Sequence, residues 1–257
     1  KLFYHKIMKN STDTKWYVII ALMLILLSVI SYSLQIYLFH NKHDTYFYLL
    51  QDISFVPIQV MIVTFFIDRL LKRQQRISLM KKVNVTIGIF FNELGNELMK
   101  KFHEMTGYKE KLQTVLDIKA GWRPKDFIRT VKLIESDPVE IDITPDDVAQ
   151  LKHFFHEKKH FILKLLENSN LSEHNTFTDT LLAVSHLSDE LSLRKNLHQI
   201  PAADLNHIKI DILRAYNGVI KEWILYLNHI KKEYPFLFSL ALRSNPFNDK
   251  ASVVIYD

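Results

Sequence analysis

The sequence contains one short motif whose residue types and spacing could support metal chemistry. The motif is His156-Glu157-Lys158-Lys159-His160, in a segment whose apolar periodicity predicts a helix. Residues four apart lie on the same face of a helix, so both imidazoles could hold Zn²⁺ while Glu157 acts as a general base. This spacing makes a zinc metallohydrolase a remote alternative among the functions of the chain.

Two features argue against catalysis at this motif. It resembles the zincin metalloprotease signature, but zincins bury an uncharged central pair beneath the active site, and here Lys158 and Lys159 are both charged. No upstream segment is predicted to form the sheet edge that binds a zincin substrate. The sequence therefore favours a protein without enzymatic activity over an enzyme.

The same helix face supports a simpler hypothesis. His153, His156 and His160 lie at positions i, i+3 and i+7, and Glu157 lies on the neighbouring face. Together they could bind a regulatory divalent ion, zinc or another, or respond to pH near the ordinary histidine range. The alternative, which the composition favours, is a solvated face of a helix rich in lysine and histidine.

A second group of polar residues lies within an apolar segment. Asp52 and Gln59 are seven residues apart and share one side of a helix, which Val56, Val63 and Ile67 continue. In a ring of identical chains this side would line a pore, with a carboxylate ring, an amide ring and an apolar collar that gates by dewetting. Alternatively, Asp52 caps the helix at the membrane interface and Gln59 hydrogen-bonds the neighbouring helix.

These residues belong to the second of two apolar segments that are long enough to cross a bilayer. The first, residues 17–39, has no charge and is too long for the apolar part of a signal peptide. Residues 40–45 are predicted to form a short polar loop and residues 46–71 the second span. The start of this span is left open, because Asp52 could begin the helix with Pro57 near its first turn.

The distribution of charge predicts the orientation of this hairpin. Residues 1–16 carry a net charge of +3, residues 40–52 carry −1 and residues 68–82 carry +5. Because lysine and arginine favour the cytoplasmic side, both termini are expected in the cytoplasm of a multi-pass protein of the cell (inner) membrane. The basic residues expected to meet lipid headgroups follow the second span; they are Lys72, Arg73, Arg76, Lys81 and Lys82.

Composition excludes several classes of protein. The formal net charge is +5, but residues 83–257 carry −2, so the positive excess lies beside the predicted membrane and nucleic acid is not an expected partner. The absence of cysteine excludes disulfides and thiolate ligands. Five glycines and seven prolines in 257 residues leave few tight turns, which favours an all-α fold.

Apolar periodicity predicts that the second span continues as one long helix to about residue 105, so that a tilt of the span would move the rest of the chain. A cytoplasmic helical domain is expected over residues 72–244, followed by an extended tail over residues 245–257. Thr144-Pro145-Asp146-Asp147 is a typical helix start. The other predicted helices cover residues 109–119, 124–135, 144–167, 176–193, 202–232 and 235–242.

Two stretches resemble an uncharacterised family of bacterial two-span membrane proteins. The first is DISFVPIQV at residues 52–60 with IDRLL at residues 67–71. The second is YPFLFSL at residues 234–240 with NPF at residues 245–247. The resemblance implies a two-span topology and a bacterial-type origin, and it implies no activity and no functional residue.

These observations predict a homo-oligomeric integral membrane protein, because two spans alone enclose too little space to conduct an ion and a polar helix face favours self-association. An ion channel or pore lined by the second span is the leading hypothesis. The alternative is a membrane-anchored scaffold or sensor whose cytoplasmic helical bundle binds a protein partner or a metal ion.

Overall fold

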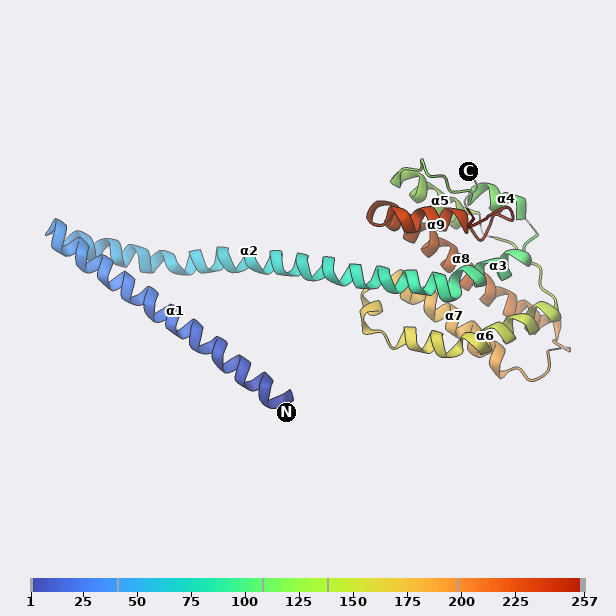
Figure 1. Ribbon diagram of the computed structural model, residues 1–257, viewed down its shortest axis with the longest axis horizontal. Coiled ribbons are helices and arrows are strands. Elements are labelled where there is room, and N and C mark those ends of the chain that lie inside the picture. Colours follow the sequence, from blue (N-terminus) through green and yellow to red (C-terminus); the bar gives the residue numbers. More distant parts are fainter. Residues whose placement is uncertain (1, 41, 108, 138, 198, 255–257) are drawn as a thin grey trace. The chain divides into compact units, whose positions relative to one another are not determined.

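Figure 1 shows the computed structural model, which describes residues 2–40, 42–107, 109–137, 139–197 and 199–254. Over these residues the protein is all-α and has no strand; an isolated antiparallel bridge joins Thr106 and Ile141. The predicted fold class is confirmed. The chain divides into two compact units, named here the hairpin unit (Lys1–Gln74) and the helical domain (Gln75–Asp257).

The helix α1 belongs to the hairpin unit, whereas α2 begins in that unit and ends in the helical domain. One turn of π-helix, η1, follows α2, and a short 3₁₀-helix, η2, precedes α7. In chain order the elements are α1 (Leu2–Phe39), α2 (Lys42–Phe90), η1 (Phe91–Gly95), α3 (Asn96–Glu104), α4 (Lys109–Val115), α5 (Pro124–Ser136), α6 (Pro145–Leu166), η2 (Ser169–Glu173), α7 (Asn175–Leu193), α8 (Ala202–Glu233) and α9 (Pro235–Arg243).

The helices of the hairpin unit are joined by a very short turn. His40 has a φ of 51°, and its N–H donates to Ile36 O at 3.0 Å, so α1 ends in the left-handed conformation typical of helix C-termini. The predicted loop 40–45 is too long, because Lys42 already begins α2 and Asp44 lies in its first turn, where an acid is stabilised by the helix dipole. Both helices are long and apolar enough to cross a membrane.

The start of α2 excludes one of the predicted alternatives. Asp52 and Pro57 both lie inside the helix, so the hypothesis that this helix begins at Asp52 is wrong. Ser54 Oγ donates to Leu50 O at 2.7 Å, a contact made within a helix. Proline is common in the first turn of a helix, but apolar helices also accept proline in their interior. Pro57 alone therefore did not decide from the sequence where this helix begins.

The helix α8 is the centre of the helical domain. It contacts α3, α5, α7 and α9, while α6 packs against α7 (Figure 1). Its buried side chains include Ile212, Tyr216, Val219, Trp223 and Leu227, which recur every three or four residues. This is the spacing of one helix face, and its burial is the main hydrophobic contribution that a single helix makes to the domain.

The long helix predicted beyond the second span is present, but η1 interrupts it. Phe90 and Phe91 are adjacent in the chain and both are buried. The ring of Phe90 meets that of Phe177 at a centroid distance of 5.1 Å, and the ring of Phe91 meets that of Tyr226 at 5.4 Å. The wider π turn thus accompanies two neighbouring rings that pack against different helices, a feature that apolar periodicity does not reveal.

The predicted start of α6 is confirmed in detail. Thr144 Oγ1 accepts from Asp147 N–H at 3.2 Å, and Asp147 Oδ2 accepts from Thr144 N–H at 2.8 Å. These reciprocal bonds form a capping box, with Pro145 at the first helical position. They satisfy backbone donors that would otherwise lack partners at the helix N-terminus.

The start of the predicted tail packs onto the domain. Residues 245–250 form turns, so the prediction of an extended tail is wrong there, and residues 255–257 lie outside the described residues. Asn245 is buried, and its Nδ2 donates to Leu116 O at 2.9 Å while its Oδ1 accepts from Phe247 N–H at 3.0 Å. An asparagine before a proline favours a turn, which outweighs the apolar run that follows.

His103 is a histidine whose imidazole ring is buried in the helical domain. The residue is 4% exposed, neither ring nitrogen has a hydrogen-bond partner, and its ring packs edge-on against Phe247 at 5.4 Å. Burial lowers the pKa of His103, although the nearby Asp249 opposes the shift. Since an unfolded histidine has a pKa of about 6.5, the unfolded chain binds a proton more readily as pH falls below that value.

We therefore expect the wild-type protein to lose stability as pH falls from about 7.5 to 5.5, with a contribution from His103 of at most about 1.4 kcal/mol per pH unit. His103→Leu should flatten this dependence in urea unfolding measured at several pH values. His160→Leu is the matched control, because His160 is an exposed histidine on α6. Equal pH dependence in the wild type and in His103→Leu would contradict the assignment.

Candidate functional site

The residues predicted to line a pore lie along one side of α2 and are all exposed in the single chain. Besides Asp52 and Gln59, they are Val56, Val63 and Ile67. The structure joins Asp52 to the other helix of the hairpin unit, because Tyr32 Oη donates to Asp52 Oδ2 at 2.8 Å. This carboxylate is therefore bonded within the chain, and a role in a pore stays a prediction.

The basic residues after the second span remain available at the surface. Lys72 Nζ lies 2.8 Å from Asp68 Oδ2, an exposed pair separated by one helical turn. Such a pair adds little to stability and is screened by salt. The full set, Lys72, Arg73, Arg76, Lys81 and Lys82, is exposed, and its contact with lipid headgroups stays a prediction.

The structure does not assemble the predicted metal site. His153, His156, Glu157 and His160 are all exposed on α6. His153 Nδ1 lies 3.9 Å from Glu157 Oε1, which is longer than a hydrogen bond. In the part of the chain that is described, no group of three or more His, Asp or Glu side chains is placed to hold a metal ion. Positions i to i+7 spread these side chains over two helical turns, too far for one ion.

A buried carboxylate near two other histidines has a different explanation. Asp211 on α8 is buried, and its Oδ1 accepts from Arg214 Nη1 at 2.7 Å. Its Oδ2 lies 3.5 Å from His186 Nε2 and 3.4 Å from His207 Nε2. The guanidinium bond compensates part of the cost of burying this charge, so we interpret the group as a structural ion pair.

The domain has a concave site that sequence patterns did not predict, named here the aromatic groove. Its lining comes from the last turns of α2 and from η1, α3, α8 and α9, and its volume is about 380 Å³. Its lining is mostly apolar and aromatic. The lining residues are Asn84, Val85, Gly88, Ile89, Phe91, Asn92, Asn96, Trp223, Tyr226, His229, Ile230, Tyr234, Phe236, Leu237, Leu240, Ala241 and Ser244.

One wall of the aromatic groove depends on a glycine. A Cβ on Gly88 would lie 2.7 Å from Tyr226 Oη, so only glycine allows this phenol to rest against α2. In that position the ring of Tyr226 stacks on Phe91 at 5.4 Å with an interplanar angle of 27°. Two rings are thereby fixed as a flat apolar wall, with the phenol oxygen at its edge.

Polar atoms converge on this apolar groove. The Oδ1 atom of Asn96 is buried and has no hydrogen-bond partner among the residues that the structure describes. Burial lowers the pKa of His229, with Glu233 opposing the shift, so its imidazole is neutral near pH 7 and presents one donor and one acceptor. Burial also raises the pKa of Tyr226, which keeps its hydroxyl protonated. The groove can therefore orient an uncharged polar group.

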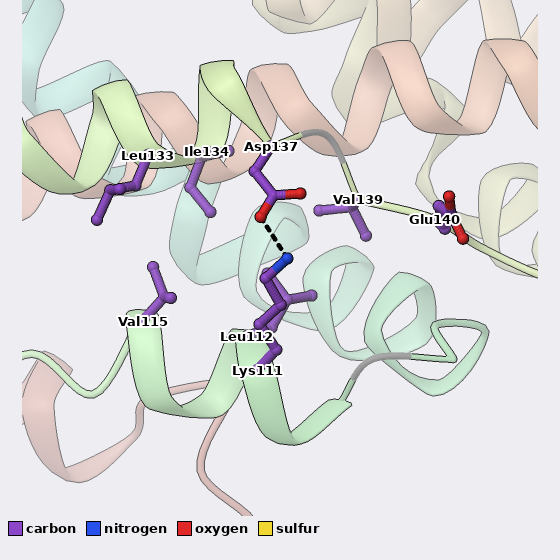
Figure 2. A pocket seen from close by; sticks show the side chains of 8 residues that line it. All are labelled: Lys111, Leu112, Val115, Leu133, Ile134, Asp137, Val139 and Glu140. Carbon is purple, nitrogen blue, oxygen red and sulfur yellow. Dashed lines mark hydrogen bonds and ion pairs between the residues drawn. The ribbon is translucent and has the colours of Figure 1, made fainter.

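A second concavity lies between α4 and the end of α5. Figure 2 shows that Lys111 and Asp137 face each other across it, and the two side chains form an ion pair. Leu112, Val115 and Leu133 contribute apolar surface to its lining, and its volume is about 320 Å³. Because its facing charges pair with each other, this pocket offers less unused hydrogen-bonding capacity than the aromatic groove.

Comparison with known proteins places the chain in a family. Residues 79–243 match the family model described as "Uncharacterized protein MJ1433, C-terminal helical domain", and residues 9–71 match "MJ1433, N-terminal helical domain". The chain belongs to the MJ1433 family. "Uncharacterized protein MJ1433" of Methanocaldococcus jannaschii is 39% identical over 245 residues, which cover 95% of this chain and 98% of the relative. No solved structure matches the chain.

The two family matches flank the division between the hairpin unit and the helical domain. One match ends at residue 71 and the other begins at residue 79, on either side of the division after Gln74. The predicted resemblance to an uncharacterised family is thus confirmed at the level of a family. Its bacterial origin and its membrane location stay predictions.

The aromatic groove was missed because its parts are far apart in sequence. Gly88 and Asn96 lie in the first half of the chain, whereas Trp223, Tyr226 and Phe236 lie near its C-terminal end. The aromatic residues of α8 looked like ordinary core positions, which Trp223 also is. The signal that could have been used is the pair of glycines at 88 and 95 in an otherwise regular helix, since an internal glycine often marks a close approach.

The hydrogen bond between Tyr32 and Asp52 gives a prediction for the hairpin unit. Tyr32→Phe should destabilise the association of α1 and α2 by about 0.6–1.7 kcal/mol, the usual contribution of a hydrogen bond between helices in a membrane. The measurement is denaturation of the protein by sodium dodecyl sulfate in mixed micelles. Tyr37→Phe, at a residue that is 74% exposed, is the matched control. Unchanged stability in Tyr32→Phe would mean that this hydrogen bond does not hold Asp52, which could then line a pore.

Proposed function

We propose that this protein is a membrane-anchored sensor whose helical domain binds a small, mostly apolar molecule in the aromatic groove. The observation that carries the proposal is the unpartnered, buried Asn96 Oδ1 in a groove walled by fixed aromatic rings. A buried polar atom without a partner is costly, and a ligand that donates a hydrogen bond to it would remove that penalty.

The size and chemistry of the groove support a small ligand. Its volume of about 380 Å³ lies within the range of ligand pockets, which is roughly 300–1,000 Å³. Such pockets combine an apolar lining with a few polar groups that fix orientation, as Asn96, His229 and Tyr226 do here. A turn of π-helix in the wall adds support, because π turns inside helices are frequent at functional sites.

We place the hairpin unit in the cell membrane and both termini in the cytoplasm. The length and apolar character of the two helices support the membrane location. The excess of lysine and arginine in residues 1–16 and 68–82 supports the orientation. The helical domain would then meet its ligand in the cytoplasm.

A homo-oligomeric pore is a less favoured proposal. It requires the carboxylate of Asp52 to face a water-filled path, whereas this carboxylate accepts a hydrogen bond from Tyr32 of the same chain. What supports self-association is that the most apolar stretch of each helix is exposed within one chain, which leaves its surface to lipid or to other copies.

The proposed ligand site can be tested with a fluorinated aromatic amide. In ¹⁹F NMR, the signal of 4-fluorobenzamide should broaden with the full chain in nanodiscs more than with empty nanodiscs. Asn96→Leu should reduce this binding without lowering stability, because it removes an unsatisfied polar atom and keeps the same branched shape of the side chain. Ala241→Phe should also reduce binding by filling the groove.

Ala203→Phe is the matched control, because Ala203 is exposed at the start of α8 and does not line the groove. It should bind the probe like the wild type. No broadening beyond that of empty nanodiscs, or equal broadening in the wild type, Asn96→Leu and Ala241→Phe, would contradict the proposal.

A further inference from the structure

A second groove, between α6 and α7, carries an inference that does not depend on the proposed function. It has a volume of about 460 Å³ and is named here the basic groove. Its lining residues are Ala149, Lys152, His153, Phe155, His156, Lys159, Ser188 and Ser192. It therefore contains two of the histidines of the predicted metal site, in a setting that has no carboxylate among its lining residues.

The charges of the basic groove have one sign. Lys152 and Lys159 are cationic at neutral pH, and His153 and His156 can donate hydrogen bonds whether neutral or protonated. Lys152, His156 and Lys159 follow one another at intervals of four and three residues, so the sequence of α6 places them on one face. A cluster of this kind attracts an anion.

These donors are only partly used within the protein. Lys152 Nζ donates to Arg194 O, which fixes the ammonium group and leaves two of its three protons for a ligand. Lys159 Nζ lies 3.7 Å from Asp189 Oδ1, and His153 Nδ1 lies 3.9 Å from Glu157 Oε1. Both separations exceed hydrogen-bonding distance but lie within ion-pair range, so an anion in the groove must compete with these two acids.

The inner surface of the groove is less polar than its rim. Phe155 and Ser188 are buried there, and Ala149 is partly buried. The ring of Phe155 can contact an apolar organic group, and the hydroxyl of Ser188 can bond one oxygen atom of a polar group attached to that organic group. The ligand should therefore combine an anionic head with a compact apolar body.

We propose that the basic groove binds the phosphate monoester group of a small organic molecule. A phosphate monoester has three terminal acceptor oxygens and a charge between −1.5 and −2 at neutral pH. This charge matches two lysines, whose long side chains can reach one anion from positions two helical turns apart, and the three oxygens can accept hydrogen bonds from Lys152, Lys159 and His156, which line the groove. A carboxylate would leave more of these donors unused.

The test is isothermal titration of the full chain with phenyl phosphate, in phosphatidylcholine nanodiscs and with a chelator present so that no metal bridges the anion. The wild type should bind phenyl phosphate more tightly than inorganic phosphate, because the ring occupies the apolar surface. The double variant His156→Gln, Lys159→Gln should weaken the binding of phenyl phosphate at least tenfold.

Lys164→Gln is the matched control, because Lys164 is an exposed lysine on the same helix that does not line the groove. It should bind like the wild type, and circular dichroism should show equal helix content in all variants. Absence of binding at millimolar phenyl phosphate, or equal weakening by Lys164→Gln, would overturn the proposal.

A phosphate monoester in a lipid headgroup has the same chemistry as a free one. Nanodiscs that contain phosphatidic acid distinguish the two sources. If phosphatidic acid in the disc weakens the binding of phenyl phosphate to the wild type, the groove takes the headgroup; if it has no effect, the groove takes a soluble ester. Either result is consistent with the proposed chemistry, provided that the double variant has lost the binding.

Discussion

The helical domain depends on the burial of α8. This helix contacts α3, α5, α7 and α9, so most helices of the domain pack around one central helix. The same helix provides Trp223, Tyr226 and His229 to the aromatic groove. A constraint that stabilises the fold therefore also fixes the positions of the groove side chains, which is what a binding site on a rigid element requires.

The core around α8 also contains polar side chains. Some of them stabilise the fold, and others could bind a ligand. Burial raises the pKa of the Glu222 carboxyl, against the opposing effects of a hydrogen bond with Thr176 and the nearby His174, and burial raises the pKa of Tyr216. Burial thus favours the neutral form of both groups, the form that is less costly to bury. Asp211 is held instead by Arg214. Glu222, Tyr216 and Asp211, like Asn96, each keep one buried oxygen without a hydrogen-bond partner among the described residues, but only Asn96 also lines the aromatic groove.

Sequence patterns predicted the helices far better than the sites. The start of α6 follows from Thr144, Pro145 and Asp147, because a capping box is a local interaction. The π turn at Phe91–Gly95 was not predicted, because it accompanies the packing of Phe90 and Phe91 against helices that lie much later in the chain. The predicted metal ligands are on one helix, but local spacing alone cannot show whether a third partner converges on them.

The aromatic groove and the basic groove both require tertiary structure to be recognised. The basic stripe of α6 was visible in the sequence as Lys152, His156 and Lys159, whereas the facing Ser188 comes from α7. The hairpin unit shows the reverse situation. Its two apolar helices are evident from length and composition, but the bond from Tyr32 to Asp52 needs the pairing of the two helices.

In the proposed arrangement, the hairpin unit anchors to the membrane a helical domain that is complete without it. A specific protease site between Gln74 and Gln75, at the division of the two units, would test this claim directly in membranes containing the folded protein. After cleavage, the helical domain should be released into the supernatant and should unfold in urea at the midpoint of the intact protein. Retention of the domain on the membrane, or release of an aggregated or unfolded fragment, would contradict the account.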